Sequence, residues 1–313
     1  MNFEHKPVLL KECIDNLDIK QDGIYIDGTI GGAGHAIEIY KRLSEKGTLI
    51  GIDQDPFAIE VSRQRLAQLE GQASFILENS NFLYMKSICR KNNITNVDGI
   101  LLDLGISSHQ VDEAERGFSY QKDAPLDMRM NRQGELTAEI IVNEFGEEEI
   151  RNILWEYGEE KWASRIASFI VDYRKKQRIK TTFQLVDIIK AAIPAKARRE
   201  GPHPAKRTFQ AIRIAVNDEL KVLEQVIDDA VALLNPGGRL CIITFHSLED
   251  RIVKTQFKNR SDPCRCSKKL PVCVCGAVKT LDVVNNKPIT ASKEELEDNP
   301  RARSAKLRVA KKV

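Results

Sequence analysis

The stretch that decides the fold is Asp27-Gly-Thr-Ile-Gly-Gly-Ala-Gly-His35, which directly follows the apolar run Ile24-Tyr-Ile26. An apolar run that opens into a glycine-dense turn is typical of a buried strand followed by a loop. Glycine permits positive φ and lets a ligand approach the bare backbone. Residues 36–43 then predict a helix whose first N–H groups face that ligand. The alternative is an ordinary tight connection between a strand and a helix.

The spacing of the glycines indicates which ligand the turn would take. A dinucleotide-binding turn has the pattern G-x-G-x-x-G, and no starting point in this turn supplies it. A second predicted strand, residues 48–52, ends at Asp53, where a carboxylate can accept hydrogen bonds from ribose hydroxyls. These features together predict a nucleoside cofactor without a pyrophosphate, and S-adenosylmethionine is the candidate.

Composition and charge narrow the class of protein. The chain has 313 residues and a formal net charge of +3, and it contains no apolar stretch near the ~18 residues that span a bilayer. No apolar signal segment follows Met1, so we expect a cytoplasmic protein without a membrane partner. Basic residues cluster at 196–213 and 301–312. Each cluster is either a solvated face or a contact for phosphates.

The order of the predicted elements indicates an α/β domain that is interrupted by helices. After a first helix at 8–17, apolar runs at 24–26, 48–52, 73–77 and 99–104 alternate with helical patterns, as in a parallel sheet. Helical patterns alone follow at 137–144, 147–157 with Gly158 as the stop, 159–176 and 182–192. The predicted domains are 1–111 and 207–313 for the two pieces of the sheet domain, and 112–206 for an all-helical insertion.

The second piece returns the chain to the sheet. A long helix at 218–234 is expected to stop at Asn235-Pro-Gly-Gly238, and residues 239–245 read as a buried strand. Ser247 is the predicted N-cap of the next helix, with Asp250 three residues further on. A final strand pair is predicted at 280–284 and 306–310.

The seven cysteines fall into two groups. Three are scattered in apolar surroundings and are interpreted as core residues: Cys13, Cys89 and Cys241. The other four form a tight cluster, Cys264-Arg-Cys266 and Cys273-Val-Cys275. This cluster is either a structural four-thiolate zinc site or a set of reduced thiols in a basic loop. No metal is predicted in the catalytic site.

Ligands of an open α/β sheet bind beyond the carboxyl ends of its strands, so the residues there are the candidates for a site. Phe82 follows the third strand and offers either an aromatic face for adenine or a core side chain. Asp103 follows the fourth strand, where it could accept a hydrogen bond from an amine or act as the acid at a helix N-terminus.

Seven segments resemble the bacterial 16S ribosomal RNA (cytosine-N4)-methyltransferase family, and they span almost the whole chain in order. They are the glycine turn 27–35, Ile100-Leu-Leu-Asp-Leu-Gly-Ile-Ser-Ser108, Glu115-Arg-Gly-Phe-Ser119, Pro125-Leu-Asp-Met-Arg-Met130, Arg207-Thr-Phe-Gln-Ala-Ile-Arg213, Phe245-His-Ser-Leu-Glu-Asp-Arg251 and Asn299-Pro-Arg-Ala-Arg-Ser304.

The resemblance implies a fold, a donor and a substrate. It implies a Rossmann-like class I methyltransferase domain with an inserted all-helical domain, and S-adenosylmethionine as donor. The implied reaction is methylation of the exocyclic amine of a decoding-region cytidine in 16S ribosomal RNA, with the small ribosomal subunit as partner. The cofactor contacts that it implies fall on Ala33, Gly34, His35, Asp53, Phe82, Asp103 and Gln110.

The catalytic residue is a separate question. Many amino-methyltransferases carry Asp/Asn/Ser-Pro-Pro-Tyr after the fourth strand, whereas this chain has Asp103-Leu-Gly-Ile-Ser-Ser108. A cytosine amine must lose a proton on methylation, and Asp103 is the predicted acceptor, with Ser107 and Ser108 as hydrogen-bonding support. His246 is either a contact for the base or a satisfied histidine beside a helix cap.

Two other classes of protein fit the sequence less well, and the oligomeric state is not predicted. A nicotinamide oxidoreductase would need the missing G-x-G-x-x-G, and a non-catalytic RNA-binding protein leaves the glycine turn and Asp53 unexplained. The sequence does not indicate an oligomeric state.

Overall fold

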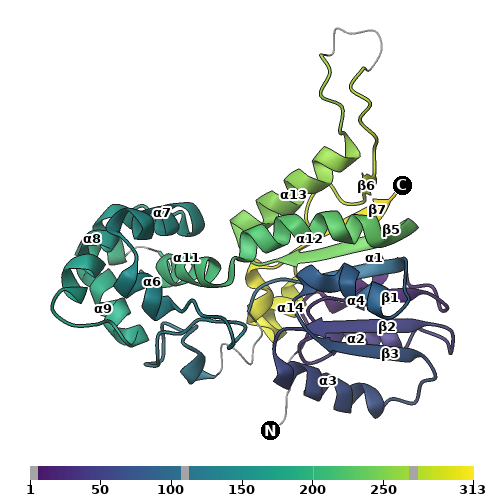
Figure 1. The fold of residues 1–313 in the computed structure, drawn as a ribbon, viewed down its shortest axis with the longest axis horizontal. Helices are drawn as coiled ribbons and strands as arrows, with labels where there is room; N and C mark the ends of the chain where they lie inside the picture. Colours follow the sequence, from purple (N-terminus) through teal and green to yellow (C-terminus); the bar gives the residue numbers. More distant parts are fainter. Residues whose placement is uncertain (1–5, 107–112, 200, 268–273) are drawn as a thin grey trace. The chain divides into compact units, whose positions relative to one another are not determined.

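The computed structural model describes residues 6–106, 113–199, 201–267 and 274–313. These residues form two compact units: residues 1–105 with 220–313 make the sheet unit, and residues 106–219 make the helical unit (Figure 1). The helical unit is longer at both ends than the predicted insertion at 112–206. At its far end the reason is helix α11 (Lys206–Asn217), which packs against α7 (Glu147–Gly158) of the same unit.

The sheet unit contains one seven-stranded sheet among its described residues, in the order β3-β2-β1-β4-β5-β7-β6. Strands β1 to β5 are parallel, and β7 runs antiparallel to both β5 and β6. The predicted strands are confirmed. The strands are β1 Ile24–Asp27, β2 Thr48–Asp53, β3 Ser74–Asn79, β4 Val97–Asp103, β5 Leu234–Thr244, β6 Leu281–Val283 and β7 Lys306–Lys312.

Helices cover both faces of this sheet (Figure 1). Successive strand residues point to opposite faces, so Ile100 and Leu102 belong to the core that includes residues of α4, α12 and α13, while Leu101 belongs to the core that includes residues of α1, α2 and α3. Burial on both faces explains the continuous apolar runs of the strands. The helices are α1 Leu10–Leu17, α2 Gly34–Tyr40, α3 Pro56–Ala67, η1 Phe82–Tyr84, α4 Met85–Lys91, α12 Glu219–Leu233, α13 Ser247–Ser261, α14 Lys293–Asp298 and η3 Pro300–Ser304. The three scattered cysteines are buried in these cores, as predicted.

The predicted turn at 235–238 lies inside a strand. Helix α12 ends at Leu233, and β5 begins at once with Leu234, which pairs with Val97 of β4. The next pair joins Arg239 to Gly99, so the intervening residues of β5 bulge out of the ladder. Turn-forming residues therefore produce a bulge here instead of a loop, because the pairing with β4 continues on both sides of them.

The helical unit has a core of its own, and the helices predicted for it are confirmed. The sequence prediction missed α11, whose basic residues were interpreted only as a charge cluster. The elements are η2 Ala114–Arg116, α6 Ala138–Glu144, α7 Glu147–Gly158, α8 Ala163–Arg174, α9 Thr182–Ala192, α10 Ala195–Arg199 and α11 Lys206–Asn217. No helix in the described parts of the chain is both long and apolar enough to cross a membrane.

Gly158 has a different role from the predicted helix stop. It is the last residue of α7, and the left-handed residue that ends the helix is Glu159, with φ of 46°. A Cβ at Gly158 would lie 2.9 Å from the carbonyl oxygen of Arg207 and 3.2 Å from Cβ of Ala211. The glycine therefore permits the close approach of α7 and α11.

This packing role predicts that Gly158→Ala destabilises the protein. Alanine favours a helix by about 1 kcal/mol over glycine, but overpacking against backbone costs about 1–3 kcal/mol. The variant should therefore have a lower free energy of unfolding than the wild type. Thermal unfolding of the full chain measures it, with Glu156→Ala on the exposed side of α7 as control. A higher melting temperature for Gly158→Ala would contradict the packing role.

Candidate cofactor and catalytic site

The glycine turn lies at the point where the strand order reverses, because β1 has β2 on one side and β4 on the other. Its backbone is anchored to both neighbours: the N–H of Gly28 donates to Leu101 O (2.9 Å) and the N–H of Ile30 donates to Ile52 O (3.0 Å). Gly31 and Ala33 both have left-handed backbones, with φ of 50° and 63°. Helix α2 then begins at Gly34, so the N-terminus of a helix faces the site.

Two side chains of α3 hold the carbonyl groups of the turn. Ser62 Oγ donates to Gly31 O at 2.8 Å, and Arg65 Nη1 donates to Gly32 O at 2.6 Å. These bonds fix the orientation of the peptide groups that a cofactor would meet. Neither residue could be predicted from the sequence as part of the site, since polar side chains on a helix are ordinary.

Asp53 joins the end of β2 to this turn. Its Oδ2 accepts from Gly31 N at 2.9 Å, and its Oδ1 accepts from Asp55 N at 2.9 Å. Burial raises the pKa of Asp53 to about 6, although the bonds from these amides work in the opposite direction. Each carboxylate oxygen has a second lone pair, so the carboxylate can hold the turn and still accept from a ribose hydroxyl.

Phe82 lies beside the first glycine of the turn. It opens η1, and Asn81 caps that element by accepting from Leu83 N at 2.8 Å. A Cβ at Gly28 would lie 3.2 Å from Phe82 Cβ and 2.5 Å from Leu102 Cδ2, so glycine is needed here. Phe82 is partly buried against the core. Its role as a face for adenine stays a prediction.

The other predicted contacts lie at the start of α2. Ala33 is the N-cap of that helix and is fully buried. Gly34 packs on Pro7, whose side-chain atoms would meet a Cβ at 3.0 Å. The ring of His35 is buried, with Nε2 at 2.9 Å from Val8 O. His35 therefore anchors the N-terminal segment through its ring. Gln110, Ser107 and Ser108 lie outside the described residues.

Asp103 is a partly buried acid at the end of β4. Its N–H donates to Thr29 Oγ1 at 2.6 Å, which links it to the glycine turn. Its Oδ1 is buried and has no hydrogen-bond partner among the residues that the structure describes. Burial, followed by the nearby charges of Asp27 and Glu249, raises the pKa of Asp103 to about 8. A carboxyl with a buried and unsatisfied oxygen is costly and typical of functional sites.

Asp27 is a fully buried acid, which the sequence prediction did not single out as a site residue. Its Oδ1 accepts from Thr29 N at 3.2 Å, and burial raises its pKa to about 7. Its place as the last residue of β1, directly before the glycines, was the available signal. Asp27 and Asp103 thus share Thr29 as a neighbour, and the charge of Asp27 contributes to the raised pKa of Asp103.

His246 is the N-cap of α13, so the predicted cap at Ser247 is wrong. His246 Nδ1 accepts from Glu249 N at 3.4 Å, and Glu249 Oε2 accepts from Phe245 N at 2.8 Å. His246 Nε2 lies 3.1 Å from Glu249 Oε1, although it is not aligned as a hydrogen bond. Helix α13 begins one residue earlier than expected, which makes Ser247 its first helical residue. This arrangement favours the interpretation of His246 as a histidine at a helix cap.

The glycine turn, Asp53 and Asp103 lie at the carboxyl ends of three neighbouring parallel strands, β1, β2 and β4. The last strand of the chain, β7, is antiparallel to β5. The fold and the site define a class I methyltransferase that depends on S-adenosylmethionine. The chain belongs to the MraW methylase family, whose model matches residues 2–313. The predicted fold class and family resemblance are therefore confirmed.

Curated relatives cover the full length of the chain. The ribosomal RNA small subunit methyltransferase H of Acetivibrio thermocellus is 66% identical over 100% of both chains. The protein of the same name from Ruminiclostridium cellulolyticum is 60% identical, again over 100% of both chains. Among solved structures, an rRNA methylase from Streptococcus thermophilus covers 97% of this chain and 93% of its own, with a TM-score of 0.40 and 9% identity. That last likeness is too low to add to the assignment.

Proposed function

We propose that this protein methylates the N4 amine of a cytidine in the decoding region of small-subunit (16S) ribosomal RNA, in the cytoplasm. The Asp103 carboxyl beside the glycine turn, with its buried Oδ1, is the structural observation that carries the proposal, because an amine substrate needs a proton acceptor there. The choice of RNA is supported by two relatives, 66% and 60% identical, whose names specify the small-subunit ribosomal RNA. The choice of cytidine N4 follows from the resemblance of the sequence motifs.

The residues present fit S-adenosylmethionine, which supplies an electrophilic methyl group when it is bound. The first turn of α2 faces the site, and Asp53 has lone pairs for ribose hydroxyls. We assign the cofactor contacts to Ala33, Gly34, His35, Asp53, Phe82, Asp103 and Gln110.

Asp103 is the proposed proton acceptor. The lone pair of a cytosine amine is delocalised into the ring, so the amine attacks only when it is held in line and its proton is accepted during or after attack. An ionised Asp103 can accept a hydrogen bond from N4–H and then take the proton. A pKa of about 8 makes it a stronger base than an ordinary aspartate.

The structure narrows the set of basic residues that could contact RNA phosphates. Arg213 makes two bonds of 2.8 Å to Glu219, and Arg308 donates to Asp250 at 2.6 Å; both arginines are largely buried. Arg207 donates to Glu159 O at the end of α7. The exposed basic residues of α10 are the better candidates: Lys196, Arg198 and Arg199.

Replacing one of these arginines should weaken RNA binding and reduce its salt dependence. If Arg198 contacts a phosphate, Arg198→Gln should flatten the slope of log affinity against log salt by about one unit. Filter binding or fluorescence anisotropy over a salt series measures the slope. Arg151→Gln is the control, because Arg151 is exposed in the same unit but pairs with Glu148 at 2.9 Å. An unchanged slope for Arg198→Gln would remove this residue from the interface.

The reaction itself is tested on the purified full chain. It is incubated with methyl-labelled S-adenosylmethionine and small subunits from a strain that lacks the enzyme, and the RNA is digested to nucleosides. Label that co-elutes with N4-methylcytidine supports the proposal, and label only on another nucleoside or only on protein contradicts it. Naked RNA is a parallel substrate. We expect it to react more slowly, since a folded RNA must present the base unstacked.

A further inference from the structure

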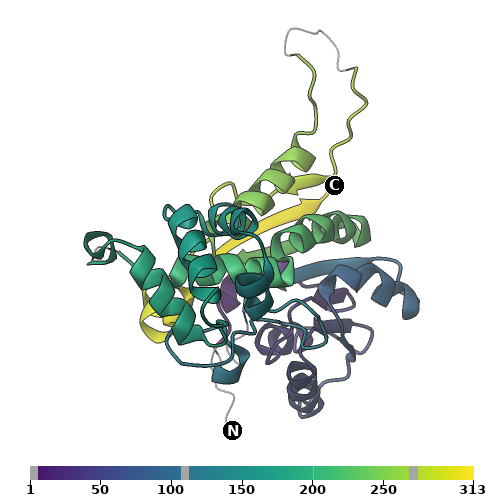
Figure 2. The ribbon, with the colours of Figure 1, turned by 60° about the vertical axis from the view of Figure 1, so that its left-hand side comes forward.

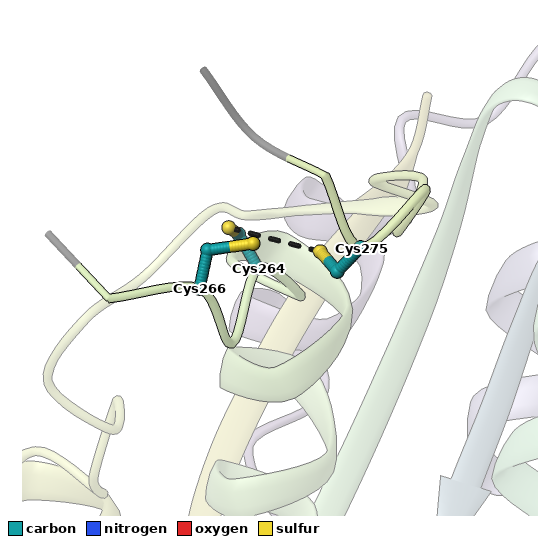
Figure 3. Close-up of side chains that lie close together, drawn as sticks. All are labelled: Cys264, Cys266 and Cys275. Carbon is teal, nitrogen blue, oxygen red and sulfur yellow. Dashed lines mark hydrogen bonds between the residues drawn. The ribbon is translucent and has the colours of Figure 1, made fainter. Parts of the chain in front are cut away.

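We propose that Cys264, Cys266 and Cys275 bind one zinc ion within the segment that joins α13 to β6, residues 262–280, which we call the cysteine loop. The three sulfur atoms all lie within 4.8 Å of one another. Figure 3 shows the side chains gathered from both arms of the loop, with Cys264 and Cys266 on the first arm and Cys275 on the second. Cys273 lies outside the described residues.

The sulfur spacing matches a metal site better than a disulfide. The Sγ atoms of Cys264 and Cys275 are 3.8 Å apart. Thiolates at ~2.3 Å from a tetrahedral zinc ion lie ~3.8 Å from one another, whereas the sulfurs of a disulfide are ~2.05 Å apart. Sulfur ligands favour zinc over magnesium or calcium, which prefer oxygen.

No apolar core explains why these sulfurs converge. The described residues of the cysteine loop contain neither helix nor strand, and Val274 and Val278 are 77% and 75% exposed. The two arms run side by side away from the end of α13 in both views (Figures 1 and 2). A backbone bond from Thr280 N to Arg260 O closes the base of the loop. Small segments without a core are commonly held by a metal, and an ion at the three sulfurs would tie the two arms together.

The site would be structural. The cluster follows the C-terminal end of α13, whereas Asp103 and the glycine turn follow the carboxyl ends of β4 and β1, and thiolate clusters of this kind are typical of structural zinc sites. We therefore expect the ion to order the cysteine loop and to take no part in methyl transfer.

The first test is the metal content of the full chain, purified without chelating resin from cells grown with zinc. Mass spectrometry of the metals should find about one zinc per chain. Competition with a chelating dye should show that Cys264→Ser or Cys275→Ser weakens zinc binding at least about 100-fold, because loss of a direct ligand exceeds the 10–100-fold effect of outer partners. Cys89→Ala, in the core, should keep the zinc. A chain that neither contains nor takes up zinc would overturn the proposal.

A second test reads the ligands directly. Cobalt(II) added to the metal-free chain should give the visible and near-ultraviolet absorption of a tetrahedral site with three or four thiolates. Trypsin should cut at Arg265, which is exposed, faster after zinc removal than before it. Absence of the thiolate bands, or a disulfide between Cys264 and Cys275 in freshly prepared protein, would contradict the assignment. Both readouts are independent of methyl transfer, so a failure of the proposed RNA activity leaves them unaffected.

Discussion

Asp103→Asn is expected to lower kcat for methyl transfer by about 10²–10⁴-fold, the contribution typical of a positioned general base. Asparagine keeps the shape of the side chain but cannot accept the proton. Cofactor affinity should change by at most about tenfold, the value of one hydrogen bond. Calorimetry and single-turnover kinetics with small subunits separate the two effects. Asp98→Asn is the control, because Asp98 lies near the other end of β4 and bonds to Ile24 N there.

The pH profile gives this prediction a second readout. The base must be ionised, and the pKa of Asp103 is raised to about 8 in the free protein. The value of kcat/KM should therefore rise with pH below about 8 and then level off. A profile without this ionisation, in a wild-type enzyme whose methyl-transfer step is rate-limiting, would rule out Asp103 as the base.

The same ionisation links Asp103 to stability. The pKa of Asp103 in the folded protein lies above the ordinary value of ~3.9. The contribution of Asp103 to the stability of the fold is therefore fully present below that ordinary pKa, where the acid is neutral. This contribution is lost as the pH rises through about 8. The stability of Asp103→Asn relative to the wild type should therefore increase as the pH rises from about 5 to about 9. Melting temperatures of the two proteins across this range measure the difference.

Asp53→Ala should weaken binding of S-adenosylmethionine by about 10- to 100-fold, because a hydrogen bond to a charged group contributes about 1.5–3 kcal/mol. The structure adds a second reason, since Asp53 also holds the N–H of Gly31. Isothermal calorimetry with the folded variant measures the loss.

A cofactor analogue that lacks the ribose hydroxyls separates the direct contact from the support of the turn. The wild type should bind this analogue more weakly than the cofactor, whereas Asp53→Ala should bind both with similar affinity. Ser62→Ala is the matched control: it removes a bond to Gly31 O but leaves Asp53 in place, so it should keep the preference for hydroxyls. Equal discrimination by wild type and Asp53→Ala would show that Asp53 acts only on the turn.

The sheet and part of the site could be predicted because their signals are local. Each parallel strand is an apolar run, and Asp53 and Asp103 are the polar residues that end two of them. Their proximity to the glycine turn follows from the strand order alone. The bond from Gly31 N to Asp53 was not among the predictions, which gave Asp53 only a role in binding the ribose.

The features that were missed depend on partners distant in the sequence. Nothing near Arg308 shows that it pairs with Asp250, and nothing near Arg65 shows that it reaches Gly32. Gly158 looks like a helix stop until the approach of Arg207 is known. A charge or a glycine can be counted from the sequence, but whether it faces solvent or a backbone is decided by tertiary packing.

The position of the helical unit between β4 and β5 has a consequence for synthesis of the chain. Strands β1 to β4 leave the ribosome first, and residues 104–233 must follow before β5 can pair with β4. During that interval one edge of β4, with its unpaired N–H and C=O groups, is open to other chains. A helical unit with its own core can fold in the meantime and shorten the loop that remains to be closed. The insertion thus delays completion of the sheet, and a nascent chain stalled within it would be especially prone to aggregate.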